Sequence, residues 1–207
     1  MRVILLDCDG TLYDDSEAHT QFNELLFSYL GKHLSISREE TIEQRKALFE
    51  KHNAVSSAVV FAKEYGLSMQ EIHEATYGKL DLTAMGVRFD PHLQEVIKNL
   101  QGSVAVWSNN PRIHVNRVIT LLGIAPFLYA FFGEEDTAPY RKPDSRAYEW
   151  IKQRFPQDAD FVLVDDSPLN LATAAFLGWE AVWCRRDPEA SLSHSFPCRI
   201  VDTIYAL

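Results

Sequence analysis

The stretch LLDCDGT (residues 5–11) decides the fold, because it places acidic side chains directly after a buried strand. The four apolar residues Val3–Leu6 form a continuous run, which is typical of a strand covered on both faces of a sheet. Side chains alternate along a strand, so Asp7 and Asp9 would project from the same side if the strand continued. Like charges at that spacing raise each other's pKa unless a cation lies between them. The stretch therefore predicts a metal ion, a shared proton, or both.

The bulk properties are those of an ordinary globular protein. With 207 residues, the chain is long enough for one domain with an insertion or for two small domains. A formal net charge of −9 argues against a protein that binds nucleic acid or a membrane surface, since such proteins are normally basic. A few basic side chains and a metal ion can still make the electrostatic potential of one cleft positive, so a small anionic substrate remains compatible with this net charge.

Cysteine usage and hydropathy indicate the compartment. Cys8, Cys184 and Cys198 are widely spaced, include no CxxC pair and cannot all pair within one chain, which favours a reducing setting. The N-terminal apolar run is too short for a signal peptide, and no segment approaches the roughly 20 apolar residues that span a bilayer. We expect a soluble cytoplasmic protein. Cys8 is expected to fill a small buried position that faces away from any site, rather than to act as a redox switch.

Residues 16–86 predict helices and no strand. Two capping boxes, Ser37 with Glu40 and Ser68 with Glu71, mark helix starts. Gly31 and Gly66 follow runs with helical spacing and mark helix ends. The predicted helices begin near residue 16, at Ser37, Val55 and Ser68, and end at about Gly31, His52, Tyr65 and Gly78.

After residue 86 the pattern alternates between helices and strands. The predicted strands cover residues 103–108, 129–132, 160–166 and 180–184, and the predicted helices cover 90–100, 111–123, 143–155 and 168–177. Such alternation implies a parallel sheet with helices on both faces. We predict an α/β fold with a core formed by residues 1–15 and 87–207, and a small all-helical insertion at residues 16–86.

Polar clusters follow three of the predicted strands. They are Asp7 to Asp9, Ser108 to Asn110, and Asp165 to Ser167. In open parallel sheets, ligands bind beyond the carboxyl ends of the strands. Four carboxylates meeting there would repel, and an oxygen-preferring cation such as Mg²⁺ removes the conflict. Each cluster alone is compatible with a turn or a helix cap, but their coincidence on one sheet edge predicts a site.

Four motifs together carry a resemblance to a known family: DCDGT (7–11), WSN (107–109), RKPD (141–144) and VDDSPLN (164–170). The chain resembles the haloacid dehalogenase-like (HAD) hydrolase superfamily over essentially its whole length, and residues 16–86 stand where that superfamily inserts a helical cap. The stretches DGTLY, NNPRIHVNRVITLLGI (109–124), VDDSPLNLATAAFLGWEAVW (164–183) and RKALFEKHN (45–53) are similar to its pyrimidine 5′-nucleotidase-like branch. The resemblance implies a Rossmannoid core with a parallel sheet flanked by helices.

The resemblance also implies hydrolysis of a phosphomonoester through an aspartyl-phosphate. In that mechanism Asp7 attacks phosphorus, while Asp9 protonates the leaving oxygen and later accepts a proton from water. Like-charge crowding is expected to raise the pKa of Asp9 so that it can carry that proton. Lys142 is expected to neutralise the nucleophile and the phosphoryl group.

The remaining roles follow from the same resemblance. Mg²⁺ would be held by Asp7, the backbone carbonyl of Asp9 and Asp166, with Asp165 acting largely through a bound water. Thr11, Ser108 and the backbone N–H of Asn109 are expected to orient the loop or to bind phosphate oxygens. From the cap, Arg45 and Lys46 are candidates for substrate contact. His114 and Arg117, three residues apart on one helical face, are expected to serve structure or the rim of the cleft.

Several alternatives stay open at this point. The substrate is expected to be a small phosphorylated metabolite, with a pyrimidine nucleoside 5′-monophosphate first, and phosphoglycolate or a sugar phosphate next. A phosphomutase similar to β-phosphoglucomutase, or a catalytically silent binding protein, would share the core motifs, and the chain could be a monomer or a homodimer. A bacterial receiver domain is excluded, because too few residues follow Asp166. Dehalogenases of the superfamily lack the second aspartate, which is present here as Asp9.

Overall fold

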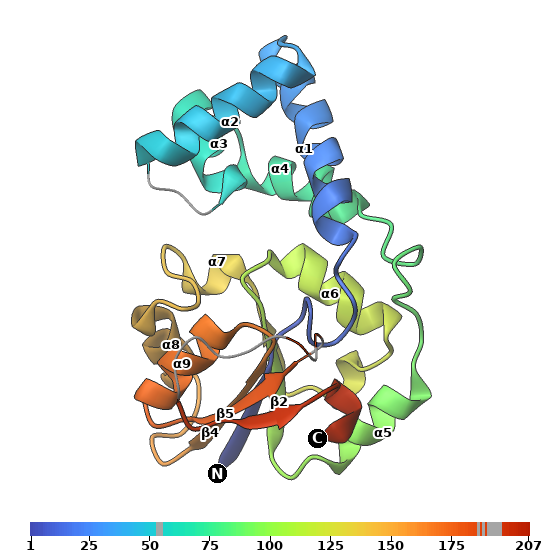
Figure 1. The fold of residues 1–207 in the computed structure, drawn as a ribbon, viewed down its shortest axis with the longest axis vertical. Helices are drawn as coiled ribbons and strands as arrows, with labels where there is room; N and C mark the ends of the chain where they lie inside the picture. The colour runs from blue at the N-terminus through green and yellow to red at the C-terminus, as the bar shows by residue number, and fades with distance from the viewer. Residues whose placement is uncertain (53–55, 186, 188, 190–195) are drawn as a thin grey trace. The chain divides into compact units, whose positions relative to one another are not determined.

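The computed structural model describes residues 1–52, 56–185, 187, 189 and 196–207 (Figure 1). The chain divides into two compact units. Met1–Asp15 and Leu82–Leu207 form one, which we call the core unit, and Ser16–Asp81 form the other, which we call the helical unit. None of the described helices is long and apolar enough to cross a membrane.

The core unit is built on a six-stranded parallel sheet with the strand order β3-β2-β1-β4-β5-β6. The strands are β1 (Arg2–Leu6), β2 (Ser103–Trp107), β3 (Ala130–Phe132), β4 (Asp160–Asp165), β5 (Glu180–Cys184) and β6 (Arg199–Val201). Leu6 of β1 is level with Val106 of β2 and Val164 of β4, so these three strands end at one edge. This register confirms the predicted α/β fold and brings the three polar clusters to the same edge.

Helices cover both faces of this sheet (Figure 1). They are α5 (Pro91–Asn99), α6 (Arg112–Leu121), the short α7 (Glu134–Thr137), α8 (Ser145–Lys152) and α9 (Pro168–Phe176), with 3₁₀ turns at Ala125–Phe127 and Ile204–Ala206. On the side of α8 and α9, a buried cluster joins Leu5 and Leu163 of the sheet to Tyr148 and Leu171 of the helices. The ring of Trp107 meets that of Tyr148 edge-on, with centroids 4.9 Å apart.

Strand β6 was not predicted from the sequence, which placed the last strand at residues 180–184. It contains only three residues, and two of them are exposed. A strand at the edge of a sheet pairs on one side only and needs no continuous apolar run. The local pattern at Arg199–Val201 therefore carries little strand signal.

The helical unit contains α1 (Ala18–Leu34), α2 (Arg38–His52), α3 (Ser57–Tyr65), α4 (Met69–Ala75) and the 3₁₀ turn Tyr77–Lys79. Both predicted capping boxes mark helix starts. The Ser37 hydroxyl accepts from the N–H of Glu40 at 3.1 Å, and the Ser37 N–H donates to the Glu40 carboxylate at 2.7 Å. At the second start, the Ser68 hydroxyl accepts from the N–H of Glu71 at 3.3 Å.

Two predicted helix limits were wrong or fall outside the described residues. Helix α1 continues through Gly31 to Leu34 and ends in the left-handed conformation of Ser35. Gly31 does not end the helix; instead, a Cβ there would lie 3.1 Å from the carbonyl oxygen of Ile36, so glycine permits the chain to turn back closely. The predicted start of the third helix at Val55 lies outside the described residues, and the described helix begins at Ser57.

We expect Leu163→Ala to destabilise the chain by about 2–5 kcal/mol, because it deletes a fully buried side chain at the centre of the sheet. Phe176→Ala is the matched control, since Phe176 is 87% exposed and its loss should change stability by no more than about 0.5 kcal/mol. Thermal unfolding of both variants, followed by circular dichroism, measures the difference. Equal unfolding temperatures for the two variants would contradict this account of the core.

Candidate active site

A buried ammonium group connects the ends of three strands. Nζ of Lys142 lies 2.7 Å from a carboxylate oxygen of Asp7, 2.7 Å from one of Asp165 and 2.9 Å from the carbonyl oxygen of Trp107. Burial lowers the pKa of Lys142, but the charges of Asp165 and Asp7 outweigh this effect and raise the pKa above its usual range. The ammonium is therefore charged, and it compensates two buried carboxylates at once.

Asn109 fixes the loop that carries this lysine. Its side-chain amide donates to the carbonyl oxygen of Lys142 and its side-chain oxygen accepts from the N–H of Lys142, both at 2.9 Å. Sequence reasoning expected only the backbone N–H of Asn109 to contribute, by binding phosphate. The side-chain contact was missed because it joins residues 33 positions apart, and no local pattern shows such a pairing.

Asp165 is satisfied entirely within the protein. Besides Lys142, its carboxylate accepts from the N–H of Ser167 at 2.9 Å and from the side-chain amide of Asn170 at 2.9 and 3.1 Å. Its side chain is fully buried. With both oxygens engaged in this way, Asp165 is suited to holding Lys142 and the start of α9.

Asp166 is the exposed member of the acidic pair. One carboxylate oxygen each from Asp7, Asp165 and Asp166 lies within 4.8 Å of the others, an all-oxygen donor set that suits a hard divalent cation. Gly10 leaves room for this arrangement, since a Cβ there would lie 2.4 Å from an oxygen of Asp166 and the φ of Gly10 is +73°. The residues present therefore fit the predicted metal ion.

Asp9 is held by donors from three segments of the core unit. Oδ1 accepts from the hydroxyl of Tyr13 at 2.5 Å and contacts Nε2 of His114 at 2.6 Å. Oδ2 accepts from the side-chain amide of Asn110 at 2.8 Å and from the hydroxyl of Ser108 at 3.3 Å. These contacts fix the orientation of Asp9. His114 was expected to serve structure or the rim of the cleft, and the structure shows that it contacts this carboxylate directly.

The expected rise in the pKa of Asp9 was wrong. Burial does raise the pKa, but His114, Tyr13 and Asn110 stabilise the ionised form more strongly and hold the pKa well below the usual range. At Asp7, burial has the largest effect and raises the pKa; the charge of Lys142 opposes it, and the like charges of Asp165, Asp9 and Asp166 add to the rise. The two aspartates of the first motif therefore have opposite electrostatic environments.

Thr11 lies beside these groups in a way that fits a ligand. Its side chain is 1% exposed, and its hydroxyl has no hydrogen-bond partner among the described residues. A buried hydroxyl without a partner is energetically costly, so a phosphate oxygen or a water would stabilise it.

The other candidates from the sequence belong to the helical unit or differ in detail from the expectation. Arg45 belongs to α2 of the helical unit, where its guanidinium donates to Asn23 at 2.8 Å and lies 5.2 Å from the ring centre of Phe49. Lys46 is exposed on the same helix. Cys8 is buried as expected, but it does not face away from the site, because its sulfur lies within 4.8 Å of ligand atoms of Asp9 and His114.

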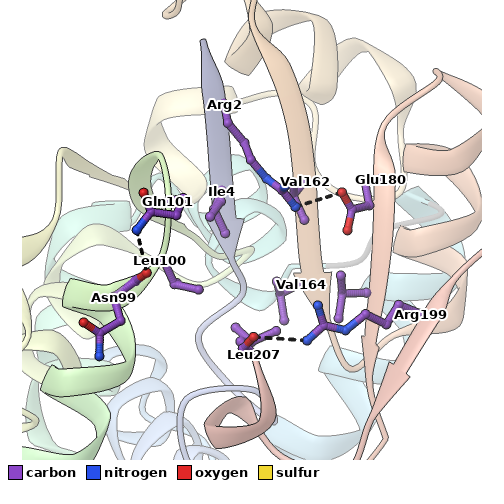
Figure 2. Close-up of a pocket in the computed structure, with 11 residues that line it drawn as sticks. Arg2, Ile4, Asn99, Leu100, Gln101, Val162, Val164, Glu180, Arg199 and Leu207 are labelled. Carbon is purple, nitrogen blue, oxygen red and sulfur yellow. Dashed lines mark hydrogen bonds and ion pairs between the residues drawn. The ribbon is translucent and has the colours of Figure 1, made fainter.

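A separate cavity of about 260 Å³ lies near the opposite edge of the sheet (Figure 2). Arg2, Glu180 and Arg199, which line it, are the first residues of β1, β5 and β6. Arg2 pairs with Glu180 at 2.9 Å, and Arg199 donates to the carbonyl oxygen of Ala206 at 2.9 Å. Its charged groups are thus engaged with one another and with backbone, and the carboxylate cluster around Lys142 is the better candidate.

Comparison with known proteins identifies the family of this chain. The haloacid dehalogenase-like hydrolase family model matches residues 1–178, and the chain belongs to that family. No curated protein matched the chain. Among solved structures, a HAD phosphatase from Thermococcus onnurineus is 20% identical with a TM-score of 0.67, over 99% of this chain and 95% of that one.

Two further solved structures show how widely this fold is shared. A 2-haloacid dehalogenase from Pseudomonas syringae pv. tomato is 18% identical with a TM-score of 0.66, over 99% of this chain and 95% of that one. The magnesium-bound YfnB protein of Bacillus subtilis is 17% identical with a TM-score of 0.62, over 99% of this chain and 96% of that one. At these identities the likeness shows the fold, and the reaction has to be argued from the residues.

We expect Lys142→Met to destabilise the protein by about 3–5 kcal/mol at neutral pH, since it leaves the carboxylates of Asp7 and Asp165 buried without compensation. Part of this loss should be recovered in mild acid, because burial raises the pKa of Asp7 and its carboxyl group can then take up a proton. Lys152→Met, at an exposed position on α8, is the control. Chemical denaturation at two pH values tests this, and a Lys142→Met variant as stable as the control would contradict it.

Divalent cation binding should weaken as the pH falls through about 6. Partial desolvation of the carboxylate and the charges of Asp165 and Asp15 raise the pKa of Asp166 to about 6, and the carboxylate must be ionised to bind a metal ion. Titration calorimetry with Mg²⁺ on either side of this pH measures the effect. In Asp166→Asn, which cannot ionise at this position, binding should be weak at both pH values; a variant that binds as tightly as the parent would argue against Asp166 as a ligand.

Proposed function

We propose that this hydrolase is a Mg²⁺-dependent phosphomonoesterase that acts through an aspartyl-phosphate on Asp7. One observation carries the proposal: Asp7 lies against the charged ammonium of Lys142 and within the oxygen cluster of Asp165 and Asp166. A carboxylate in these surroundings can approach an anionic phosphate, because the lysine and a bound cation offset the repulsion.

The residues divide the reaction into two displacements. In the first, an oxygen of Asp7 forms a bond to phosphorus while the bond from phosphorus to the ester oxygen breaks, and Asp9 delivers a proton to the departing oxygen. In the second, Asp9 takes a proton from water, which attacks phosphorus and releases Asp7. Lys142 balances the negative charge on Asp7 and on the phosphoryl group in both steps.

Asp9 has to be protonated for the first step, and it is ionised in the protein alone. A phosphate dianion bound beside Asp9 adds like charge, which raises the pKa of that carboxyl and favours uptake of the proton with the substrate. The contacts of Asn110 and His114 hold the Asp9 carboxylate in one orientation throughout.

Dehalogenases of the superfamily lack this second aspartate, so its presence favours phosphate transfer over dehalogenation.

Asp7, the backbone carbonyl of Asp9 and Asp166 would hold the metal ion, which supplies charge stabilisation for the phosphoryl group when bound. Asp165, which was expected to act through a bound water, would contribute through Lys142 instead. The hydroxyl of Thr11 and the backbone N–H of Asn109 are proposed to bind phosphate oxygens. The hydroxyl of Ser108 is also proposed to bind a phosphate oxygen, in exchange for its 3.3 Å hydrogen bond to Asp9.

The substrate is proposed to be a small phosphorylated metabolite, with a pyrimidine nucleoside 5′-monophosphate first. The similarity of residues 45–53 and 109–124 to that branch supports this choice, and Arg45 and Lys46 on α2 are the proposed contacts from the helical unit, acting as a cap. Phosphoglycolate, sugar phosphates and phosphoryl transfer within a sugar are alternatives with the same core chemistry.

We expect Asp7→Asn to reduce phosphate release by at least about a thousand-fold while leaving the fold intact, because it removes the nucleophile. Asp160→Asn, at the far end of β4, is the matched control and should retain activity. Release of inorganic phosphate is measured from pyrimidine and purine monophosphates, sugar phosphates and phosphoglycolate, each with Mg²⁺ and with a chelator.

The outcomes separate the alternatives. Metal-dependent release led by UMP or CMP supports the nucleotidase assignment. Phosphate that moves to another carbon of a sugar, seen by ³¹P NMR, indicates a mutase. No turnover of any substrate by a folded, Mg²⁺-loaded protein would favour a binding role, and near-normal activity of Asp7→Asn would refute the mechanism.

A further inference from the structure

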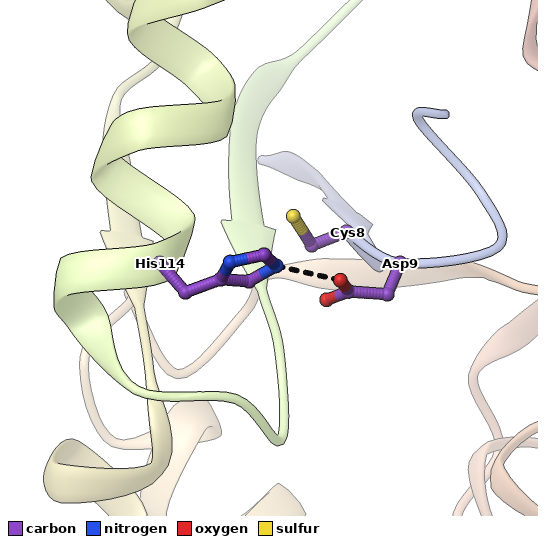
Figure 3. Close-up of side chains that lie close together, drawn as sticks. All are labelled: Cys8, Asp9 and His114. Atoms are coloured by element: carbon purple, nitrogen blue, oxygen red, sulfur yellow. Dashed lines mark hydrogen bonds and ion pairs between the residues drawn. The ribbon is translucent and has the colours of Figure 1, made fainter. Parts of the chain in front are cut away.

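A second group of metal-capable side chains lies next to the oxygen cluster and has a different chemistry. Cys8, Asp9 and His114 each offer one ligand atom, and these three atoms lie within 4.8 Å of one another (Figure 3). Cys8 and Asp9 follow β1, whereas His114 comes from the first turn of α6. The side chains of Cys8 and His114 are fully buried, and that of Asp9 is 13% exposed.

The contacts within this triad already converge on one carboxylate. Nε2 of His114 lies 2.6 Å from Oδ1 of Asp9, and the sulfur of Cys8 lies within 4.8 Å of a carboxylate oxygen of Asp9. The hydroxyl of Tyr13 lies 2.5 Å from the same Oδ1 and 3.3 Å from Nε2 of His114. A thiol, an imidazole, a carboxylate and a phenol thus lie close together.

We propose that Cys8, Asp9 and His114 form a binding site for a thiophilic divalent cation of the Zn²⁺ type. Sulfur, imidazole nitrogen and carboxylate oxygen are the ligands that zinc takes in proteins, usually four around one ion. The cluster of Asp7, Asp165 and Asp166 offers oxygen alone and suits Mg²⁺. Two neighbouring sites thus select different metals by ligand type, with the Tyr13 hydroxyl or a water at the fourth position.

Protons have to leave when the cation binds. The Cys8 thiol gives its proton to solvent as the sulfur–metal bond forms, and the imidazole of His114 binds through a nitrogen lone pair. The negative charges of Asp9 and Asp7 next to the sulfur favour a cation at this point.

The consequence for activity rests on the proposed function. An ion on Oδ1 of Asp9 occupies the carboxylate that exchanges a proton with the leaving group and with water. Zn²⁺ should therefore inhibit the phosphatase reaction, and an excess of Mg²⁺ should not restore the rate, because the two ions do not share their side-chain ligands. A chelator selective for zinc over magnesium should restore it.

The site is tested directly with Co²⁺ as a spectroscopic substitute for Zn²⁺ on the full chain. One equivalent should produce a thiolate-to-cobalt charge-transfer band, which an all-oxygen site cannot give, and Zn²⁺ should displace it. Cys8→Ala should lose the band and bind Zn²⁺ at least about tenfold more weakly, as loss of even an outer partner does in metal sites. Cys184→Ala, at another buried cysteine, is the matched control and should keep the band.

Two further variants keep this inference separate from the proposed function. Asp7→Asn should be inactive and still give the cobalt band, whereas His114→Gln should lose the band with Cys8 intact. If the parent protein shows the band without turning over any phosphate ester, the metal site stands and the proposed function fails. Absence of the band at one equivalent of Co²⁺, or its persistence in Cys8→Ala, would overturn the site.

Discussion

The ion pairs of Lys142 are the interaction on which the rest of the core unit depends. One ammonium group contacts the carboxylates of Asp7 and Asp165 and the backbone carbonyl of Trp107, and so joins the ends of β1, β4 and β2. Without that charge, two carboxylates would be buried side by side in a medium that screens them poorly. Two of the central strands, β1 and β4, can end in acidic residues because this cation lies between their carboxylates.

The geometry of a parallel sheet explains why these groups meet. Asp7 follows Leu6, which is level with Val164 of β4, and the N–H of Asp7 donates to the carbonyl of Val164 at 2.8 Å. Asp165 follows Val164 directly, so both carboxylates leave the sheet at the same height. The loop before α8 then has to deliver a cation to this point, and the paired hydrogen bonds between Asn109 and the backbone of Lys142 hold it in place.

Much of this could be predicted from the sequence, because its signals are local. Apolar runs indicated five of the six strands, and the polar clusters after three of them indicated the edge at which these strands meet. The contact of His114 with Asp9 was not visible, since a histidine on the inner face of α6, beside Val115 and Val118, has the pattern of an ordinary core position. It joins residues 105 positions apart, and only the fold brings them together.

The pKa of Asp9 was mispredicted for a related reason. Counting nearby carboxylates in the sequence suggests repulsion, but it omits the donors that other elements supply. Tyr13 comes from the loop after the first motif, Asn110 from the loop after β2 and His114 from α6. Three partners that favour the ionised form outweigh the effect of burial on this pKa.

Two aspartates one residue apart thus acquire different properties from their surroundings. Asp7 lies among like charges and a single lysine, so it gains from any further cation at the oxygen cluster. Asp9 lies among hydrogen-bond donors, which fix its direction and keep it ionised until negative charge arrives beside it. A nucleophile needs compensated charge, and a proton carrier needs a fixed position and a pKa that responds to the substrate. Strand alternation places both residues at one edge, and the elements packed on either side make them unequal.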